Sequence, residues 1–229
     1  TEVVSASLCH GGDLSRVVTI GLARGGSAIA KAGPAPRIEA AMLRAIAASG
    51  APAPAVLAVD ARLLVLERLA DTGRPDDAWS ALGRALATLH ACRGDGYGWP
   101  DDYAFGPLAI VNQMSRAGHP APSDPDWPGF WAACRLAVHL PALDPPLARR
   151  IERLIAGLRD RLPAHPPAAL LHGDLWGGNI LVADSRVTGL IDPACYHGAA
   201  EVDIAMLGLF DTPTPAFFEA YGPLAPGHD

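Results

Sequence analysis

The acidic and amide side chains of one short segment have the types and the spacing that phosphoryl transfer needs. Asp174 lies in a polar loop, Asn179 follows five positions later, and Asp192 ends the next apolar run. Transfer of a γ-phosphoryl group requires a carboxylate that orients and deprotonates the acceptor hydroxyl, and oxygen ligands that hold Mg²⁺ against the triphosphate. We therefore predict that Asp174 is the catalytic base of an ATP-dependent phosphotransferase, and that Asn179 and Asp192 are Mg²⁺ ligands.

Two short strands must bring the second carboxylate back to the loop. The run ILVADSRVTGLID (180–192) has β-branched and aliphatic residues on both sides of an Asp-Ser turn, which is typical of a β-hairpin. Such a hairpin would place Asp192 beside Asn179. Protein kinases have the same spacing in HRDxxxxN followed by DFG, whereas this chain has HGD at 172–174 and Pro193 after the second Asp. A single Asp or Asn is more often a turn former, but here order, spacing and flanking strands agree.

The first 69 residues are predicted to form a small β-rich lobe with one helix. Apolar runs separated by Gly pairs predict the strands, and the spacing of Leu43, Ile46 and Ala47 predicts the helix. The predicted strands are 3–8, 16–22, 27–31 and 61–69, and the predicted helix is 39–48. Strand, helix and strand again are what a lobe that grips ATP requires.

Residues 70–229 are predicted to form a second, mostly helical lobe, because apolar residues recur there at helical spacing. A long ordered loop rich in Gly, Pro and Asp is predicted at 94–128, and loops of this length are often functional. The predicted helices are 76–90, 129–140, 145–162, 202–210 and 216–221.

Several residues of the first lobe are candidates for binding the nucleotide. Lys31 ends a predicted strand, where its ammonium group could reach phosphate oxygens, and Glu39 on the following helix could pair with it. Gly11 and Gly12 would let backbone amides approach phosphates closely, although a Gly pair usually marks only a turn. Backbone groups where the two lobes should join could bind the adenine edge. These groups belong to Glu67, Arg68 and Leu69.

The composition argues against several other classes of protein. The chain has 229 residues, of which 50% are hydrophobic and 18% are charged. No apolar run is long enough to span a bilayer, and the first residues lack the basic segment and the apolar core of a signal peptide. A formal net charge of -6 argues against broad attraction to nucleic acid. The cysteines are dispersed without a CxxC pair, so we expect reduced thiols. We expect a cytoplasmic monomer or homodimer that binds small molecules and contacts neither nucleic acid nor membrane.

Motifs spread through nearly the whole chain resemble those of one known family, the fructosamine kinases or ketosamine-3-kinases, within the wider aminoglycoside-phosphotransferase-like kinases. The HGD motif is shared by many small-molecule kinases, whereas the Trp176-Gly177-Gly178 insert and DPACYHG are more particular to this family. The motifs are GGDLSRV (11–17), YGWPDD (97–102), HGDLWGGNILV (172–182), IDPACYHG (191–198) and EVDIAM (201–206).

The resemblance implies an α+β, bilobal, protein-kinase-like fold. Residues 1–69 would form an N-terminal lobe with a small antiparallel β-sheet and one helix, and residues 70–229 a mostly helical lobe that holds the catalytic and acceptor sites. The implied activity is phosphorylation of a sugar hydroxyl of a ketosamine, either free or protein-bound, with ATP and Mg²⁺. Such an activity belongs to the repair of glycated amines.

The resemblance also assigns roles to single residues. Asp174 matches the catalytic base, Asn179 and Asp192 the magnesium ligands, and Lys31 with Glu39 the pair that positions the phosphates. His172 would be structural, and Asp203 would brace the catalytic loop without contacting substrate. The indole of Trp176 suits the apolar side of a sugar, although a packing role is equally plausible. The candidate substrate contacts within the motifs are Trp99, Trp176, Tyr196 and His197.

Other functions stay open at this point. A related kinase could phosphorylate an aminoglycoside, choline or another amino-alcohol, but an aminoglycoside pocket needs several carboxylates, and only Asp101 and Asp102 form an acidic cluster. Similar proteins continue past Asp229 into further helices, so we expect an incomplete C-terminal lobe, and a truncated nucleotide-binding pseudokinase is another alternative. A metallohydrolase using His172 and His197 lacks a paired-His spacing.

One cysteine suggests a redox hypothesis. Cys9 lies just before Gly11, so a disulfide with another chain could make the phosphate loop redox-sensitive. An unreactive, buried thiol is the simpler expectation.

Overall fold

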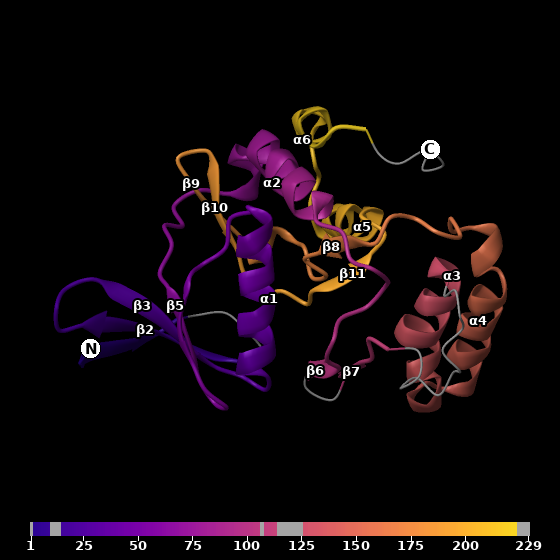
Figure 1. The fold of residues 1–229 in the computed structure, drawn as a ribbon, viewed down its shortest axis with the longest axis horizontal. Helices are drawn as coiled ribbons and strands as arrows, with labels where there is room; N and C mark the ends of the chain where they lie inside the picture. The colour runs from indigo at the N-terminus through magenta and orange to yellow at the C-terminus, as the bar shows by residue number, and fades with distance from the viewer. Residues whose placement is uncertain (1, 10–14, 106–107, 114–125, 224–229) are drawn as a thin grey trace.

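A five-stranded antiparallel sheet forms one end of the molecule (Figure 1). The computed structural model describes residues 2–9, 15–105, 108–113 and 126–223. In spatial order the strands are β1 (Val3–Leu8), β2 (Arg16–Leu22), β3 (Ser27–Ala32), β5 (Leu64–Glu67) and β4 (Val56–Val59). The predictions for the first three strands are confirmed.

The last two strands differ from the prediction. β4 was not predicted, because four residues are too few to show an alternating pattern. β5 is shorter than the predicted strand at 61–69, because a turn occupies the positions before it. The Asp60 Oδ1 atom accepts hydrogen bonds from the backbone N–H groups of Arg62 at 2.7 Å and Leu63 at 2.8 Å. This local side-chain capping competes with extension of the strand.

Helix α1 (Pro36–Ser49) packs between the sheet and the rest of the molecule. It begins before the predicted start, since Pro36 has a helical φ and has no N–H group to leave unpaired in the first turn. It ends at Ser49, and the following Gly50 caps it with a left-handed φ of 89°. One set of its apolar residues, including Leu43, packs on Leu64 of the sheet.

A second set of α1 residues joins the core of the C-terminal part. Met42 and Ile46 are buried in one cluster with Leu82 and Leu86 of the next helix, α2 (Trp79–Ala91). The hydrophobic core therefore continues from the sheet-bearing part into the helical part. The lobe boundary after residue 69 stays a prediction, because apolar packing crosses it.

Among its described residues, the C-terminal part is mostly helical, with three two-stranded sheets between the helices. Figure 1 shows α3 and α4 at the end of the molecule opposite the sheet, with α5, β8 and β11 between them and α1. The remaining α-helices are α3 (Trp127–Trp131), α4 (Pro145–Ala156), α5 (Glu201–Phe210) and α6 (Pro215–Tyr221). The paired strands are β6 (Tyr103–Phe105) with β7 (Leu108–Ile110), β8 (Ala169–Leu171) with β11 (Tyr196–Gly198), and β9 (Ile180–Ala183) with β10 (Arg186–Leu190).

Three predictions for this part need correction. The predicted helix at 129–140 is divided into α3, a π-helical turn η2 (Ala132–Leu136) and a 3₁₀ segment η3 (Ala137–Ala142), which contains Pro141. Proline has no N–H to donate to the carbonyl one α-turn before it, so Pro141 prevents a regular helix from continuing past this segment, but it does not explain the earlier π-helical turn. The predicted helix at 145–162 ends at Ala156, where Gly157 forms its C-cap. The predicted loop at 94–128 contains the β6–β7 pair.

The predicted hairpin at 180–192 is confirmed. β9 and β10 are antiparallel, and the turn residues Asp184 and Ser185 have φ values of 52° and 55°. Two successive residues with positive φ match the twist of a tight hairpin, and Asp tolerates this conformation better than most residues.

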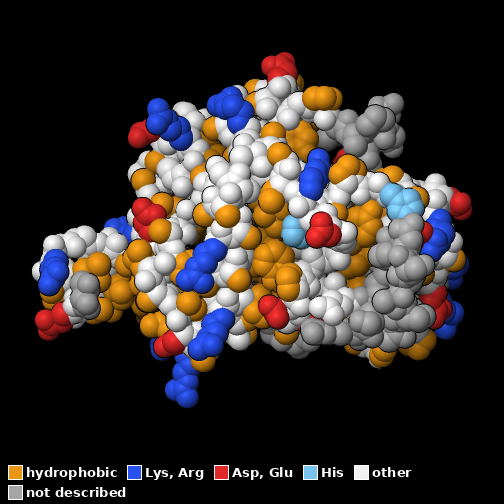
Figure 2. Space-filling view, viewed as in Figure 1, with side chains coloured by type: hydrophobic (Ala, Val, Ile, Leu, Met, Phe, Trp, Pro, Cys, Tyr) orange, Lys and Arg blue, Asp and Glu red, His pale blue; other side chains and the backbone are white. Residues whose placement is uncertain are grey.

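The surface carries no extended area of one charge on the face shown in Figure 2, where acidic and basic side chains are interspersed. Hydrophobic side chains gather near the middle of that face. In the described part of the chain, no helix has both the length and the apolar character needed to cross a membrane.

Candidate active site

Lys31 joins the sheet to the catalytic segment. On β3 it is nearly buried, with 7% of its surface exposed. Its Nζ atom donates to Glu39 Oε1 at 2.8 Å and to Asp192 Oδ1 at 2.7 Å. The contact with Glu39 is the one expected from the sequence. The contact with Asp192 links residues 161 positions apart and was not predicted.

The charges of this cluster are coupled. Burial by itself lowers the pKa of Lys31, but the carboxylates of Glu39 and Asp192 outweigh it and raise that pKa above its ordinary value. Burial raises the pKa of Glu39, although the lysine opposes this effect. The two carboxylates therefore keep Lys31 protonated, so that its ammonium group can pair with an anionic ligand.

The loop after β8 turns sharply at Gly173, which has a φ of 81°. A Cβ atom at this position would lie 2.1 Å from the carbonyl oxygen of Ala194, so only glycine fits. The backbone N–H of Ala194 donates to the carbonyl of His172 at 2.8 Å. This close approach holds the start of the loop against the segment that follows Asp192.

His172 is buried and supports the loop from within. Its Nε2 atom donates to the carbonyl of Ile191 at 2.9 Å, and its Nδ1 atom lies 3.4 Å from the backbone N of Asp174. Burial lowers the pKa of the imidazole below its ordinary value, and the nearby carboxylates do not reverse this. The neutral ring therefore fits the structural role that the resemblance implied.

Asn179 orients the side chain of Asp174. Its Nδ2 group donates to the carbonyl of Asp174 at 2.8 Å and to the carboxylate Oδ2 at 3.0 Å. The backbone N–H of Ile191 donates to the carbonyl of Asn179 at 3.0 Å, which places the next residue, Asp192, close to Asn179. The three residues predicted from one motif thus lie on neighbouring, hydrogen-bonded segments.

The side-chain oxygen atoms of Asn179 and Asp192 are suitable ligands for Mg²⁺. Both amide hydrogens of Asn179 point to Asp174, which leaves the amide oxygen as the atom that can coordinate a cation. The Asp192 side chain is 41% exposed, and only its Oδ1 atom is engaged by Lys31 in the contacts seen here. One carboxylate and one amide oxygen are hard ligands, and Mg²⁺ is commonly held by one or two such groups with phosphate and water oxygens.

A buried carboxylate on α5 fixes the backbone of the catalytic loop. Asp203 on α5 accepts from the backbone N–H groups of His172 at 2.7 Å and Gly173 at 2.9 Å. Burial alone raises the pKa of Asp203, but its hydrogen bond to His90 and the other donors outweigh burial and lower that pKa below its ordinary value. The expected bracing contact is therefore present.

His90 extends this support, and the sequence predictions did not include it. Its Nε2 atom lies 3.1 Å from Asp203 Oδ2, and its Nδ1 atom lies 2.9 Å from the hydroxyl of Tyr221. A His at the end of an apolar helix face was the available signal, but such a residue gives no indication of its partner. α2, α5 and α6 thus meet through one buried polar chain.

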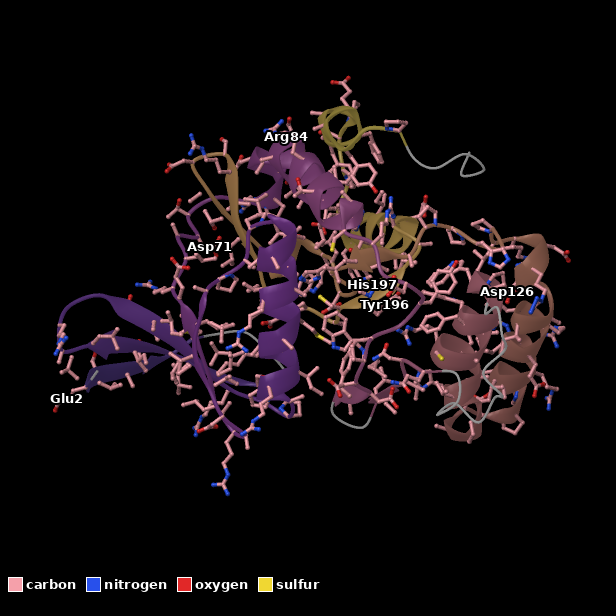
Figure 3. All side chains as sticks on the ribbon, in the orientation of Figure 1. Glu2, Asp71, Arg84, Asp126, Tyr196 and His197 are labelled. Carbon is pink, nitrogen blue, oxygen red and sulfur yellow. The ribbon has the colours of Figure 1, made fainter. Side chains whose placement is uncertain are left out.

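The candidate substrate residues lie in different environments. Trp176 is 41% exposed and close in sequence to Asp174. The rings of Trp99 and His197 are stacked, with centroids 6.3 Å apart, and both are partly exposed. Figure 3 shows Tyr196 and His197 on β11 in the middle of the molecule. Tyr196 is only 4% exposed, and the guanidinium of Arg135 lies 4.2 Å from its ring centroid, so we assign Tyr196 to the core.

The candidate nucleotide residues are only partly placed. Gly11 and Gly12 lie outside the described residues. The backbone N–H of Glu67 donates to the carbonyl of Ala55 at 2.9 Å, so this donor is used within the sheet and is not available to adenine. Arg68 Nη1 lies 3.4 Å from Ser27 Oγ, and the backbone groups of Arg68 and Leu69 stay candidates. The Cys9 Sγ atom lies 3.2 Å from Thr19 Oγ1, and the redox hypothesis for this thiol stays a prediction.

The chain is similar to one family through most of its length. A family model described as fructosamine kinase matches residues 31–229. A protein described as a probable ketoamine kinase from Synechocystis is 34% identical over 71% of this chain and 54% of that protein. A probable ketoamine kinase from Escherichia coli is 35% identical over 67% of this chain and 52% of that protein. The chain thus spans about half the length of these two relatives.

Solved structures share the fold. The structure of a protein from Thermobifida fusca, provisionally described as a fructosamine-3-kinase, has a TM-score of 0.84 and 30% identity, over 99% of this chain and 82% of that one. The aminoglycoside phosphotransferase APH(4)-Ia has a TM-score of 0.64 at 18% identity, over 89% of this chain and 71% of that one, which shows the fold alone. The predicted α+β, kinase-like fold is confirmed.

Proposed function

Because the chain belongs to the fructosamine kinase family, we propose that it transfers the γ-phosphoryl group of ATP to a sugar hydroxyl of a ketosamine. Fructosamines and ribulosamines, free or protein-bound, are the proposed acceptors, and repair of glycated amines is the proposed role. One observation carries the proposal most directly. The ammonium group of Lys31, on β3, directly contacts the carboxylate of Asp192, the last residue of the catalytic segment.

Asp174 acts as the base in the proposed reaction. Its carboxylate is oriented by Asn179 and by a loop whose backbone Asp203 holds from behind. An acceptor hydroxyl that donates to this carboxylate would be aligned, and its proton would pass to Asp174 as the oxygen attacks phosphorus. Lys31 would bind phosphate oxygens, with Glu39 keeping its ammonium group in place. Mg²⁺, when held by Asn179 and Asp192, would supply neutralisation of phosphate charge.

The family and the aromatic side chains near the loop support the proposed acceptor class. An exposed indole, such as that of Trp176, suits the apolar face of a sugar ring. An aminoglycoside, a polycation, would need several free carboxylates. Asp102 is already engaged, since its Oδ1 atom accepts from the backbone N–H of Asn112 at 2.7 Å. A ketosamine carries at most one charged amine at the sugar, so it makes a smaller demand for acidic partners.

The function is tested by measuring ADP formation with ATP and Mg²⁺ in the presence of fructoselysine, ribuloselysine and a panel of aminoglycosides. The Asp174→Asn variant is the matched control. We expect turnover with at least one ketosamine that greatly exceeds turnover with any aminoglycoside. Equal rates for the chain and its variant with every acceptor would refute the catalytic proposal, and a preference for aminoglycosides would refute the acceptor class.

A substitution of Lys31 tests the nucleotide site separately. Lys31→Met keeps an unbranched side chain of nearly the same length but removes the cation that faces Glu39 and Asp192. We expect affinity for a nonhydrolysable ATP analogue to fall by about tenfold or more, since losing one charge-assisted contact is worth at least about 1.4 kcal/mol. Isothermal titration calorimetry measures this change. Arg44→Met, an exposed position on the helix that carries Glu39, is the control, and an equal loss there would contradict a specific role of Lys31.

A further inference from the structure

Helix α5 contacts the catalytic loop at two separate places. Near the start of the helix, Asp203 binds the backbone of His172 and Gly173. At its C-cap, Asp211 binds the backbone N–H of Gly177. Asp174 and Trp176 lie between these two anchored positions. The first contact was expected from the sequence, whereas neither the motifs nor the proposed reaction assigns a role to Asp211.

The contact made by Asp211 is short and charge-assisted. The Gly177 N–H donates to Asp211 Oδ2 at 2.7 Å, and a carboxylate is a stronger acceptor for a backbone N–H than a neutral group. The Asp211 backbone is itself fixed, because its N–H donates to the carbonyl of Leu207 at 2.9 Å. The carboxylate therefore connects the end of a regular helix to the loop.

The geometry of Gly177 matches this carboxylate. A Cβ atom added at Gly177 would lie 2.6 Å from Asp211 Oδ1, so the carboxylate would have to move away from its present position. Gly177 does not need glycine for a positive φ, since its φ is outside that region. Glycine at position 177 thus allows the Asp211 carboxylate to approach the backbone closely.

The anchored position adjoins two residues of the site, Trp176 and Asn179. Gly177 begins the 3₁₀ turn η5 (Gly177–Asn179), and the N–H of Asn179 donates to the carbonyl of Trp176 at 2.9 Å. The ring of Trp176 also lies 6.1 Å from the ring of Phe210, the residue before Asp211. The end of α5 thus supports the turn that presents Asn179 and the indole of Trp176.

We propose that Asp211 is a positioning residue, which sets the place of Trp176 and Asn179 relative to Asp174 through its hydrogen bond to Gly177. The inference rests on the proposed phosphoryl transfer for its kinetic part. Without the carboxylate, the Gly177–Asn179 turn loses its fixed attachment to α5. Misplacement of reacting groups by about 1 Å can cost about a hundredfold in rate, so a looser turn is expected to reduce kcat measurably.

Hydrogen exchange tests the contact independently of activity. In Asp211→Ala, the Gly177 amide should exchange at least about tenfold faster than in the unchanged chain, as measured by NMR, because its acceptor is gone. The Gly173 amide, which Asp203 holds, should keep its exchange rate. Equal acceleration at both amides would show general destabilisation of the protein and would overturn a local role of Asp211.

Kinetics of a double-mutant cycle test the consequence. Asp211→Ala and Gly177→Ala should each lower kcat by about tenfold, because each breaks the same contact. The double variant should be no worse than either single one, since the added methyl group no longer meets a carboxylate. Asp211→Asn, which keeps an acceptor oxygen, should recover most of kcat. Gly208→Ala on the same helix, where an added Cβ meets no atom within 4 Å, is the control.

The outcomes separate this inference from the proposed function. Strictly additive losses in kcat, or unchanged kcat in Asp211→Ala, would overturn the positioning role while leaving phosphoryl transfer intact. Absence of turnover in the unchanged chain with every acceptor would refute the proposed function and the kinetic role with it. In that case, the exchange of the Gly177 amide would still decide whether Asp211 anchors the loop.

Discussion

Asp174→Asn is expected to lower kcat by about a thousandfold, within the range of 10² to 10⁴ that removal of a general base produces. The amide oxygen of the new Asn can still accept from Asn179, so the loop geometry is retained while the basic group is lost. Affinity for a nonhydrolysable ATP analogue with Mg²⁺ should change little, because neither proposed metal ligand is altered. Steady-state kinetics and titration calorimetry measure the two quantities.

The control for this prediction is Asp184→Asn in the exposed turn between β9 and β10. Asp184 has a positive φ, which Asn also tolerates, so this variant should keep both stability and activity. A decrease in kcat for Asp174→Asn that is only severalfold would mean that another group accepts the proton. That result would contradict the assignment of Asp174 as the base.

The largest expected effect on folding comes from Asp203→Asn. Asp203 is fully buried and accepts from two backbone N–H groups, while a ring nitrogen of His90 lies 3.1 Å from its Oδ2 atom. An amide has only one acceptor oxygen, so its NH₂ group must face a donor that then stays unsatisfied. We expect the free energy of unfolding to fall by about 3 kcal/mol or more, because the buried carboxylate is lost and one backbone donor is left unsatisfied. Urea denaturation measures this change.

The pH dependence of stability should change in the same variant. The folded protein holds the pKa of Asp203 below its ordinary value of 3.8. The ionised carboxylate therefore contributes stability above that ordinary value, and this contribution is lost as the pH falls through the lowered pKa. Asp203→Asn should lose less stability on acidification below about pH 4 than the unchanged chain does. Asp76→Asn, at an exposed position, should follow the unchanged chain, and identical acid profiles for all three proteins would contradict the assignment.

The hairpin at 180–192 and the first three strands were predictable because their signals are local. β-Branched and aliphatic residues on both sides of an Asp-Ser turn indicate a tight hairpin from a short stretch of sequence. The division of the segment 129–140 was harder to predict, since its apolar spacing is helical, and Pro141 just after it indicates only where a regular helix must end. The short strands β4, β6 and β7 have too few residues for a reliable pattern.

The candidate site was predictable to a similar extent. The order and spacing of Asp174, Asn179 and Asp192 indicated one chemistry, and the structure places them on adjoining segments. Tyr196 was proposed from its motif as a substrate contact, but its ring lies in the core beneath Arg135. A sequence motif identifies residues that are adjacent in the chain, whereas the exposure of each side chain depends on which face of its strand is covered by other elements.

The sequence by itself determined the type of chemistry that this protein can support, because that depends on residue types and on short, local spacing. Only the tertiary structure decided which partners hold those residues in place. Lys31 with Asp192, His90 with Asp203, and Gly177 with Asp211 each join segments far apart in the chain. Such pairs are selected by the packing of helices against the sheet and the loop, and no local propensity specifies them.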